Sequence, residues 1–332
     1  MAGGGLCGGG PVFLRARIPR RTVACGDALR APPGRPVRGE GPVARHRTVW
    51  SVGHCVETQA VKPYRIGRKK RNGSDLLDIE IIPCTDVDRA TAVFHRDGFV
   101  AVSGALTPEQ LAFAQAGAKR VIAEQMAAIP LDRANRGFAR YSFGPQVHHP
   151  EWTQLVDLPT VLPVLDKIWG SSDYRCMGAG GDYSTPGAKI QPLHSDLGDF
   201  LKDPFGQVTC RDLPTPFIVI NFLMVDFKEV NGAIRFIPGT QRSRHPIPTL
   251  EEEPERMKRS IVCAPAGTAV IRDVRCWHGG TANASDEIRP MTSAGYVAPW
   301  FRMPQYGDYM PRTLYDTLSP RAKELCRFMV EV

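Results

Sequence analysis

The sequence lacks any apolar run long enough to cross a membrane. The longest run, residues 217–225, has nine residues and is interrupted by Asn221, whereas a membrane-spanning helix needs about 20. A secretory pattern is also absent, because no apolar segment near the start is followed by a small-residue cleavage site. We therefore expect no membrane span.

The nine cysteines form no C-x-x-C pair and show no zinc-finger spacing. An odd number of cysteines in a long chain is a poor disulfide framework, so a reducing compartment, with a cytoplasmic location, is the favoured interpretation. The alternative is an organelle such as a mitochondrion or plastid, which the Arg-rich start of the chain suggests. That start has no serine before Ser51, although transit peptides are usually rich in serine.

Acidic residues are scarce at the start of the chain. Residues 1–74 carry 15 Lys and Arg but 3 Asp and Glu, whereas the remaining residues carry 27 and 31. The basic excess therefore belongs to the tail, and no nucleic-acid partner is expected for the body. Residues 1–80 are predicted to be a mostly disordered basic tail, which an organelle leader would also resemble, and residues 81–332 a single catalytic domain. The oligomeric state is left open.

Helix signals stand in the front half of the body. Residues 86–97 predict a short helix that ends at Gly98, with a strand at 99–102. Thr107 followed by Pro108 and Gln110 has the form of a capping box, which predicts a helix to about residue 128. A surface loop over 131–151 and a helix over 159–169 should follow.

After Gly180 the apolar period shortens toward two, which favours strands. The strands are expected at 188–193, 217–227, 233–237, 260–263, 268–272 and 291–299. Short strands separated by Gly-containing turns, without helical crossovers, are typical of a β-sandwich or jelly roll. The predicted fold is mainly β with flanking helices.

A candidate metal site begins with His194 and Asp196, which alternation along an extended segment sends to one side. His278, 82 residues further on, supplies a third ligand. Two imidazoles and one carboxylate make the facial triad of non-haem Fe(II) oxygenases. The tripeptide alone is a weak signal, because residues 95–97 have the same spacing but no partners downstream. We interpret that copy as a helix end, with Asp97 in the turn.

Arg289 strengthens the choice of His194 over His95. It stands 11 residues after His278, and a guanidinium pairs bidentately with a carboxylate such as the distal group of an α-keto acid. Each residue alone is more often structural. The ordered set in a strand-rich half favours a functional interpretation.

At this point the sequence resembles the phytanoyl-CoA dioxygenase family of Fe(II)/2-oxoglutarate oxygenases. The resemblance covers residues 93–301. It is carried by the motifs FHRDGFV at residues 94–100, QPLHSD at 191–196, NGAIRFIPGT at 231–240, and Trp277-His278 with Arg289. The family fold is a double-stranded β-helix, a cupin-like jelly roll.

The resemblance implies that His194, Asp196 and His278 bind Fe(II), which uses 2-oxoglutarate and O2, and that Arg289 holds the distal carboxylate of 2-oxoglutarate. It also implies that Gln191 contacts the co-substrate; a locally paired amide is the alternative. Two positions depart from the family pattern. Ile234 stands where some relatives place a hydroxyl, and Gln241 replaces a frequent His. The carboxylate of Asp196 favours hydroxylation over halogenation.

Other candidates have weaker support. Trp277 is interpreted either as a wall of the site or as core, and Asn221 as facing the barrel mouth or as a buried hydrogen-bonded side chain. Arg140 and Tyr141, with residues 199–214, are candidates for a lid. The pair His148 and His149 is expected at the surface.

The predicted function is a 2-oxoglutarate-dependent dioxygenase that hydroxylates an unactivated C–H bond of a small-molecule or acyl substrate, with release of succinate and CO2. The alternatives are a non-catalytic metal-binding jelly-roll module and an interaction protein recruited by its basic tail. Formation of succinate separates the first from the other two.

Overall fold

The computed structural model describes residues 79–301 and 310–330. The predicted tail therefore lies almost wholly outside the described residues. The strands are β1 (Ile81–Pro83), β2 (Phe99–Ser103), β3 (Arg140–Ser142), β4 (Arg175–Ser184), β5 (Phe217–Leu223), β6 (Ile234–Phe236), β7 (Ala269–Asp273), β8 (His278–Gly280) and β9 (Arg289–Val297).

The helices flank these strands. They are α1 (Val87–Asp97), α2 (Pro108–Ala128), α3 (Pro150–Thr153), α4 (Leu162–Trp169), α5 (Glu255–Lys258), α6 (Arg312–Tyr315) and α7 (Pro320–Cys326), with single 3-10 turns at Leu131–Arg133 and Thr240–Arg242.

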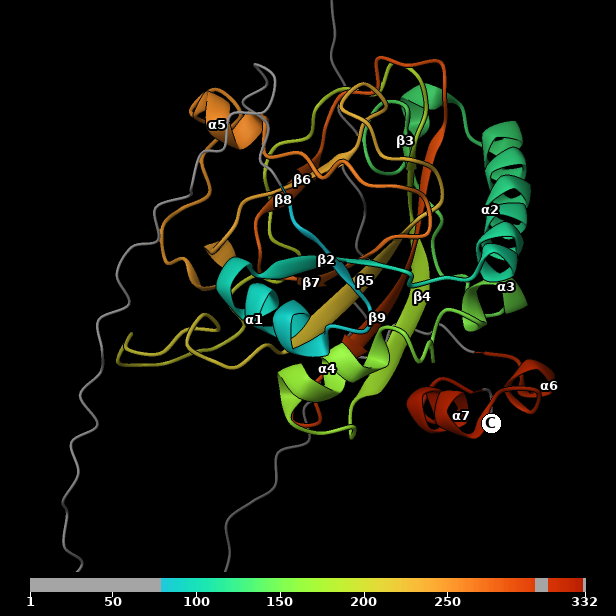
Figure 1. Ribbon diagram of the computed structural model, residues 1–332. Coiled ribbons are helices and arrows are strands. Elements are labelled where there is room, and N and C mark those ends of the chain that lie inside the picture. Colours follow the sequence, from blue (N-terminus) through green and yellow to red (C-terminus); the bar gives the residue numbers. More distant parts are fainter. Residues whose placement is uncertain (1–78, 302–309, 331–332) are drawn as a thin grey trace, which may run out of the picture. The chain divides into compact units, whose positions relative to one another are not determined.

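Seven strands form a major sheet in the order β1-β2-β7-β5-β9-β4-β3, antiparallel except for the pair β1 and β2. A minor sheet pairs β6 with β8. Two extended segments widen it, because His194 exchanges backbone hydrogen bonds with His278 and Ile261 bridges to Arg235. Figure 1 shows the long strands of the major sheet, with α1 and α4 in front of them and α2 to one side.

Apolar side chains cover both faces of the major sheet. On the outer face, strand residues such as Phe222 and Tyr296 pack with Phe94 of α1 and Leu165 of α4. On the inner face, strand residues such as Met291 pack against β6 of the minor sheet. Full burial of a side chain such as Phe222 contributes about 1.5–3 kcal/mol. The predicted mainly β fold with flanking helices, a jelly roll of two facing sheets, is confirmed.

The local helix signals were read correctly. Thr107 accepts a hydrogen bond from the Gln110 backbone and Gln110 caps back to the Thr107 backbone, so the capping box starts α2, which ends at Ala128. Gly98 ends α1 with φ 83°, a conformation that glycine adopts without strain. The predicted helix over 159–169 begins later, at Leu162, because Pro163 fits only the first turn of a helix.

Several strand boundaries were wrong. The segment 188–193 forms no strand, and the bridge to β8 is made by the next residue, His194. The segment 260–263 joins β6 by the single bridge of Ile261 to Arg235. The predicted strand 217–227 ends at Leu223, and the predicted strand 291–299 is β9, which starts two residues earlier and ends at Val297.

Four strands, β1, β3, β4 and β8, were missed. The ten-residue β4 contains three glycines, which have low strand propensity. Gly180 is needed there because a Cβ would collide with the Gly144 carbonyl. The region 131–151, predicted as a surface loop, contributes β3 and α3 to the fold. A three-residue strand is too short to show a period.

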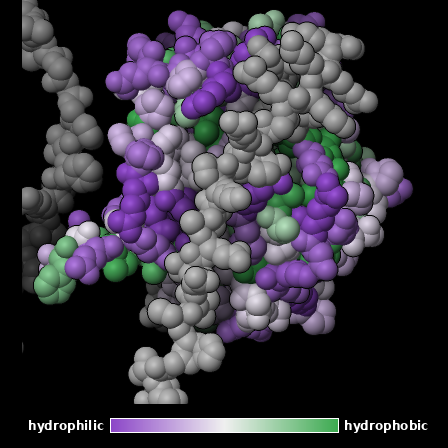
Figure 2. Space-filling view, turned by 60° about the vertical axis from the view of Figure 1, so that its left-hand side comes forward, coloured by the Kyte–Doolittle hydropathy of each residue, from purple (hydrophilic) through white to green (hydrophobic). Residues whose placement is uncertain are grey.

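Hydrophilic residues predominate on the face shown in Figure 2, and the hydrophobic ones appear there in small patches. Among residues 79–301 and 310–330, no helix combines the length and the apolar character that a membrane span requires.

Candidate metal centre and co-substrate site

The two predicted histidines and the predicted aspartate meet at one point. His194 ends an extended segment beside β8, Asp196 lies two residues further, and His278 is the first residue of β8. His194 Nε2 lies 3.7 Å from Asp196 Oδ1, and His278 Nε2 lies 3.5 Å from Asp196 Oδ2. Within the described ranges, this is the one group of three or more His, Cys, Asp or Glu residues arranged to hold a metal ion.

Backbone carbonyls orient both imidazoles. His194 Nδ1 lies 3.2 Å from the Pro192 carbonyl, and His278 Nδ1 lies 2.9 Å from the Cys276 carbonyl. A carbonyl accepts a proton donor, so Nδ1 carries the hydrogen and Nε2 keeps its lone pair. The Nε2 atoms are the ones that face Asp196. This is the arrangement that metal-binding histidines require.

Arg272 of β7 reaches the same carboxylate. Its Nη2 lies 2.7 Å from Asp196 Oδ2, and its Nε donates to Asn221 Oδ1 at 3.0 Å. Burial opposes ionisation of Asp196, but the Arg272 guanidinium and the two imidazoles outweigh it and hold the pKa of this carboxyl below its ordinary value. Burial, and then the charge of Arg272, lower the pKa of His278 to about 3. The site therefore presents an anionic carboxylate and a neutral His278 at neutral pH.

Arg289, the first residue of β9, is 2% exposed. Its Nε donates to the Gly232 carbonyl at 3.0 Å, and its guanidinium lies 4.9 Å from the centre of the Phe227 ring. Within the described part of the chain its Nη1 reaches no acceptor, and no carboxylate lies at ion-pairing distance. Burial, with the nearby charge of Arg140, lowers the pKa of Arg289 to about 9.

A cavity of about 440 Å³ opens beside His194. Its lining includes Arg136, Phe138, Arg140, Lys189 and Gln191. The Gln191 amide is locally paired, because its Oε1 accepts from the Gly280 backbone at 3.0 Å and its Nε2 donates to the Arg136 carbonyl at 3.3 Å. Its predicted contact with a co-substrate stays a prediction.

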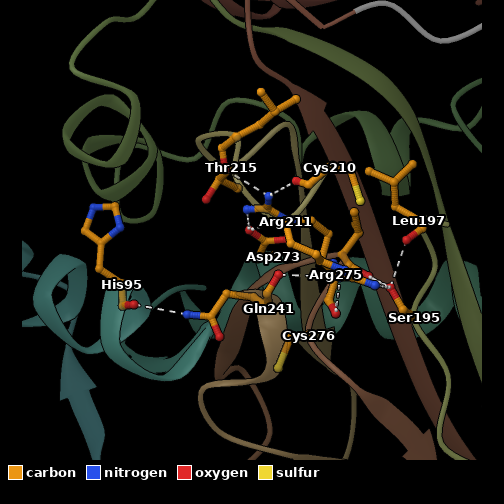
Figure 3. Close-up of polar contacts among 12 residues, drawn as sticks. His95, Ser195, Leu197, Cys210, Arg211, Thr215, Gln241, Asp273, Arg275 and Cys276 are labelled. Carbon is orange, nitrogen blue, oxygen red and sulfur yellow. Dashed lines mark hydrogen bonds and ion pairs between the residues drawn. The ribbon is translucent and has the colours of Figure 1, made fainter. Parts of the chain in front are cut away.

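The turns that carry the ligands are fastened to a long loop (Figure 3). Arg275, buried three residues before His278, donates from Nη1 to the Cys210 carbonyl at 2.6 Å. Arg211 donates to the Arg275 carbonyl at 3.2 Å and reaches Ser195 Oγ at 3.5 Å. Residues of the loop 199–214 therefore form hydrogen bonds both to the segment that carries His194 and Asp196 and to the turn that precedes His278.

The other candidate residues, Trp277, Asn221, His148 and His149, lie in different surroundings in the structure. Trp277 packs with Leu193 and Ile237 in a cluster of their own, so it is core. Asn221 is a buried, hydrogen-bonded side chain, because its Oδ1 accepts from Arg272 Nε. The rings of His148 and His149 lie 4.0 Å apart, outside the metal group.

The first copy of the tripeptide is structural, as interpreted. The His95 carbonyl accepts from Gln241 Nε2 at 3.1 Å, which Figure 3 shows, and Asp97 pairs with Arg96 at the end of α1. Gln241, noted as a departure from the family pattern, thus fastens α1 to the turn after β6. Ile234, the other departure, packs inside the barrel.

The prediction that Arg140 and Tyr141 form a lid is wrong. Both are buried in β3. Arg140 Nη2 donates to the Lys189 and Thr281 carbonyls, and the Tyr141 hydroxyl donates to the Ile129 carbonyl. Arg140 lines the cavity from β3, whereas Tyr141 packs in the outer hydrophobic cluster.

Sequence reasoning missed Arg272. The strand containing it was predicted, and alternation from the buried Val270 would have turned Arg272 to the same inner face as the metal ligands. A charged residue two positions from an apolar inner residue was the available signal.

The model of the family described as phytanoyl-CoA dioxygenase (PhyH) matches residues 94–291, more than half of the chain. The chain belongs to the phytanoyl-CoA dioxygenase family. Its curated relatives include the dioxygenase af480 of Aspergillus fumigatus, 29% identical over 178 residues, which are 52% of this chain and 54% of that protein. The Fe(II)/2-oxoglutarate-dependent dioxygenase nvfF of Aspergillus novofumigatus is 23% identical over 267 residues, 73% of this chain and 82% of that protein. The chain spans about half the length of the first curated relatives it matches.

Solved structures share the fold of this family member. HygX from Streptomyces hygroscopicus, with nickel, 2-oxoglutarate and hygromycin B bound, superposes with a TM-score of 0.51 at 15% identity, covering 67% of this chain and 90% of that one. The epimerase SnoN in complex with Fe3+, alpha ketoglutarate and nogalamycin RO gives 0.50 at 21% identity, covering 64% and 84%.

Proposed function

We propose that the protein is an Fe(II)/2-oxoglutarate-dependent dioxygenase that oxidises a C–H bond of a small-molecule or acyl substrate and releases succinate and CO2. The observation that carries the proposal is the convergence of two imidazole Nε2 atoms and one carboxylate in a barrel that also buries Arg289, whose Nη1 has no acceptor among the described residues. Family membership supports the same reaction class.

The donor set fits Fe(II). His194, His278 and Asp196 would hold the ion, with the remaining coordination positions left to co-substrate and O2. Bound Fe(II) supplies the oxidising chemistry once 2-oxoglutarate and O2 are present. Backbone carbonyls lie beside both Nδ1 atoms, so the Nε2 atoms are the ones that face the metal position.

Arg289 is the proposed partner of the distal carboxylate of 2-oxoglutarate. A buried guanidinium with an unsatisfied donor is costly, and an anion that accepts from it removes that cost. Arg140, whose pKa burial lowers to about 10, adds a second buried positive charge nearby. Gln191, held by the Gly280 backbone, is proposed to line the same space.

The cavity beside His194 is the proposed substrate entrance. Phe138 is 51% exposed at its rim and offers an apolar surface, while Arg136 and Lys189 provide positive charge. Two structural neighbours hold a small molecule together with the co-substrate, which supports a small-molecule substrate.

The proposal is tested by anaerobic titration of the full chain with Fe(II) and 2-oxoglutarate, followed by the visible charge-transfer absorbance of the ternary complex. The expected result is a saturable band that His194→Ala loses and His95→Ala retains. Exposure to O2 with a metabolite extract should then release succinate above the level of the extract alone.

A band without succinate under every substrate condition would favour a non-catalytic metal-binding module, and no band would refute the metal site. Loss of the band in His95→Ala with retention in His194→Ala would mean that the wrong tripeptide was chosen.

The remaining parts of the proposal concern the setting of the enzyme. The six described cysteines are all free, which supports a reducing compartment such as the cytoplasm. Residues 1–80 are proposed to be a basic tail outside the catalytic domain, and no nucleic-acid partner is proposed.

A further inference from the structure

We infer that Arg272 is a positioning residue for the metal centre, which holds the carboxylate of Asp196 in the orientation that binds the ion. The inference rests on the proposed function and adds a residue to its site. Arg272 does not need to touch Fe(II) or 2-oxoglutarate to act in this way.

The contacts of Arg272 fix it in place. It is 7% exposed at the end of β7. Its Nε is held by Asn221 Oδ1 at 3.0 Å, and Asn221 lies on the neighbouring strand β5, itself 2% exposed. A guanidinium anchored by a buried amide has one orientation, so the hydrogen bond to Asp196 at 2.7 Å has a defined direction.

Asp196 needs such a partner. It lies in a half-exposed turn after His194 and outside every strand, whereas His278 is fixed by β8. Its backbone N donates to the Val274 carbonyl at 3.0 Å, but among the described residues Arg272 is the one non-imidazole side chain at ion-pairing distance from its carboxylate. Outer partners of this kind commonly set metal affinity, with losses of about 10- to 100-fold when they are removed.

The direction in which Mn(II) affinity changes when Arg272 is removed distinguishes a positioning role from a purely electrostatic one. A guanidinium is a cation, so by charge alone its removal would strengthen the binding of a divalent ion at Asp196. Positioning predicts the opposite, weaker binding. The two explanations therefore differ in direction, not only in size.

The experiment measures Mn(II) dissociation constants of the full chain by EPR under anaerobic conditions, and then 2-oxoglutarate dissociation constants at saturating Mn(II). Arg272→Met should raise the Mn(II) constant about 10- to 100-fold and leave the 2-oxoglutarate constant within about twofold. Arg272→Lys should restore part of the loss, because an ammonium can reach Asp196 but cannot also be held by Asn221 in the same plane.

Three further variants control the measurement. Arg120→Met removes a guanidinium of α2 that pairs with Glu151 of α3, outside the metal group, and should change neither constant. Arg289→Met should show the reverse pattern, with Mn(II) binding kept and 2-oxoglutarate binding weakened. Asn221→Ala keeps the charge of Arg272 but removes the hydrogen bond that orients its guanidinium. We expect it to lose less Mn(II) affinity than Arg272→Met, and it provides a test if Arg272→Met does not fold.

If Arg272→Met binds Mn(II) as tightly as wild type or more tightly, the inference is overturned and the proposed function still stands. If Arg272→Met does not fold, the same result for Asn221→Ala has the same meaning. The same holds if Arg272→Met weakens 2-oxoglutarate binding alone, since Arg272 would then be a co-substrate ligand. Failure of the wild-type chain to bind Mn(II) would overturn both.

Discussion

Two buried arginines of this chain are equally hidden from solvent but differ in their partners. Arg275 is 0% exposed, and all three nitrogens of its guanidinium group have acceptors. Its Nε and Nη2 donate to the Asp273 carboxylate, and its Nη1 donates to the Cys210 and Leu213 carbonyls. Arg289 is 2% exposed, and its Nη1 has no acceptor in the described ranges. Arg289 also has no carboxylate at ion-pairing distance among the described residues, whereas Arg275 pairs with Asp273. Buried charges are normally paired, so a buried guanidinium without a carboxylate is a candidate to bind an anionic ligand.

The first way to break this contrast is to remove the partner of Arg275. Asp273→Ala leaves a buried guanidinium without its carboxylate, and we expect the free energy of unfolding to fall by about 3–5 kcal/mol. Urea denaturation of the metal-free chain measures this. A loss below about 1 kcal/mol would mean that the pair is not structural and that the distinction from Arg289 fails.

The matching change at the other arginine is Arg289→Met. Because no protein carboxylate loses its partner, we expect unfolding stability to stay within about 1 kcal/mol of wild type or to rise. The affinity for 2-oxoglutarate should fall by about 10- to 150-fold, the equivalent of about 1.5–3 kcal/mol for a charged hydrogen bond.

Arg289→Lys serves as the conservative control and should recover part of the 2-oxoglutarate affinity, because an ammonium is a point charge without the planar fork. If both variants bound 2-oxoglutarate like wild type, Arg289 would be excluded as its anchor.

The parts of this picture that were predictable from sequence are those specified locally. The capping box of Thr107 and the stop at Gly98 depend on a few neighbouring residues, and the order of His194, Asp196, His278 and Arg289 depends on spacing along strands. By contrast, β4 was missed because its glycines are required by a neighbouring backbone, which the local sequence does not reveal.

Arg272 and Arg140 were missed or misplaced for a similar reason. A lone arginine usually lies in solvent, and only the pairing of β7 with β5, or of β3 with β4, turns these two inward. The metal ligands can be predicted from sequence because histidine and aspartate at this spacing are typical of a metal site. The side chains that support the ligands can be identified only from their contacts in the folded chain.

A third test uses the acid response of the metal-free protein. Burial lowers the pKa of His278 to about 3 in the folded chain, whereas an unfolded histidine titrates near 6.5. Below about pH 6.5 the unfolded chain therefore binds a proton at this histidine that the folded chain does not bind. The free energy of unfolding then decreases by up to about 1.4 kcal/mol for each unit that the pH is lowered. Between pH 6.5 and 5 the loss should reach about 2 kcal/mol.

His278→Gln provides the control for this slope. His95 and His149, whose pKa values burial also lowers, remain in the variant, so the difference between the two curves belongs to His278. Asp196 acts in the same direction but at lower pH: its pKa is also lowered, so its contribution to stability is lost only as pH falls below about 4. Identical slopes for the two proteins above pH 5 would show that His278 is not held neutral.

The smallest effect is expected from removal of the basic tail. The hydrogen bonds described for Arg275 and Arg289 are all made by residues within 79–301. Glu80 forms an ion pair with Arg89, so the shortened chain must include it. A chain starting at Ile79 should therefore keep its melting temperature within about 2 °C, less than the shift that 1 kcal/mol gives a domain of this size, and its 2-oxoglutarate affinity. A clear fall in either would mean that residues 1–78 contribute to the barrel or to its mouth, and that the contrast between paired and unpaired arginines omits part of the molecule.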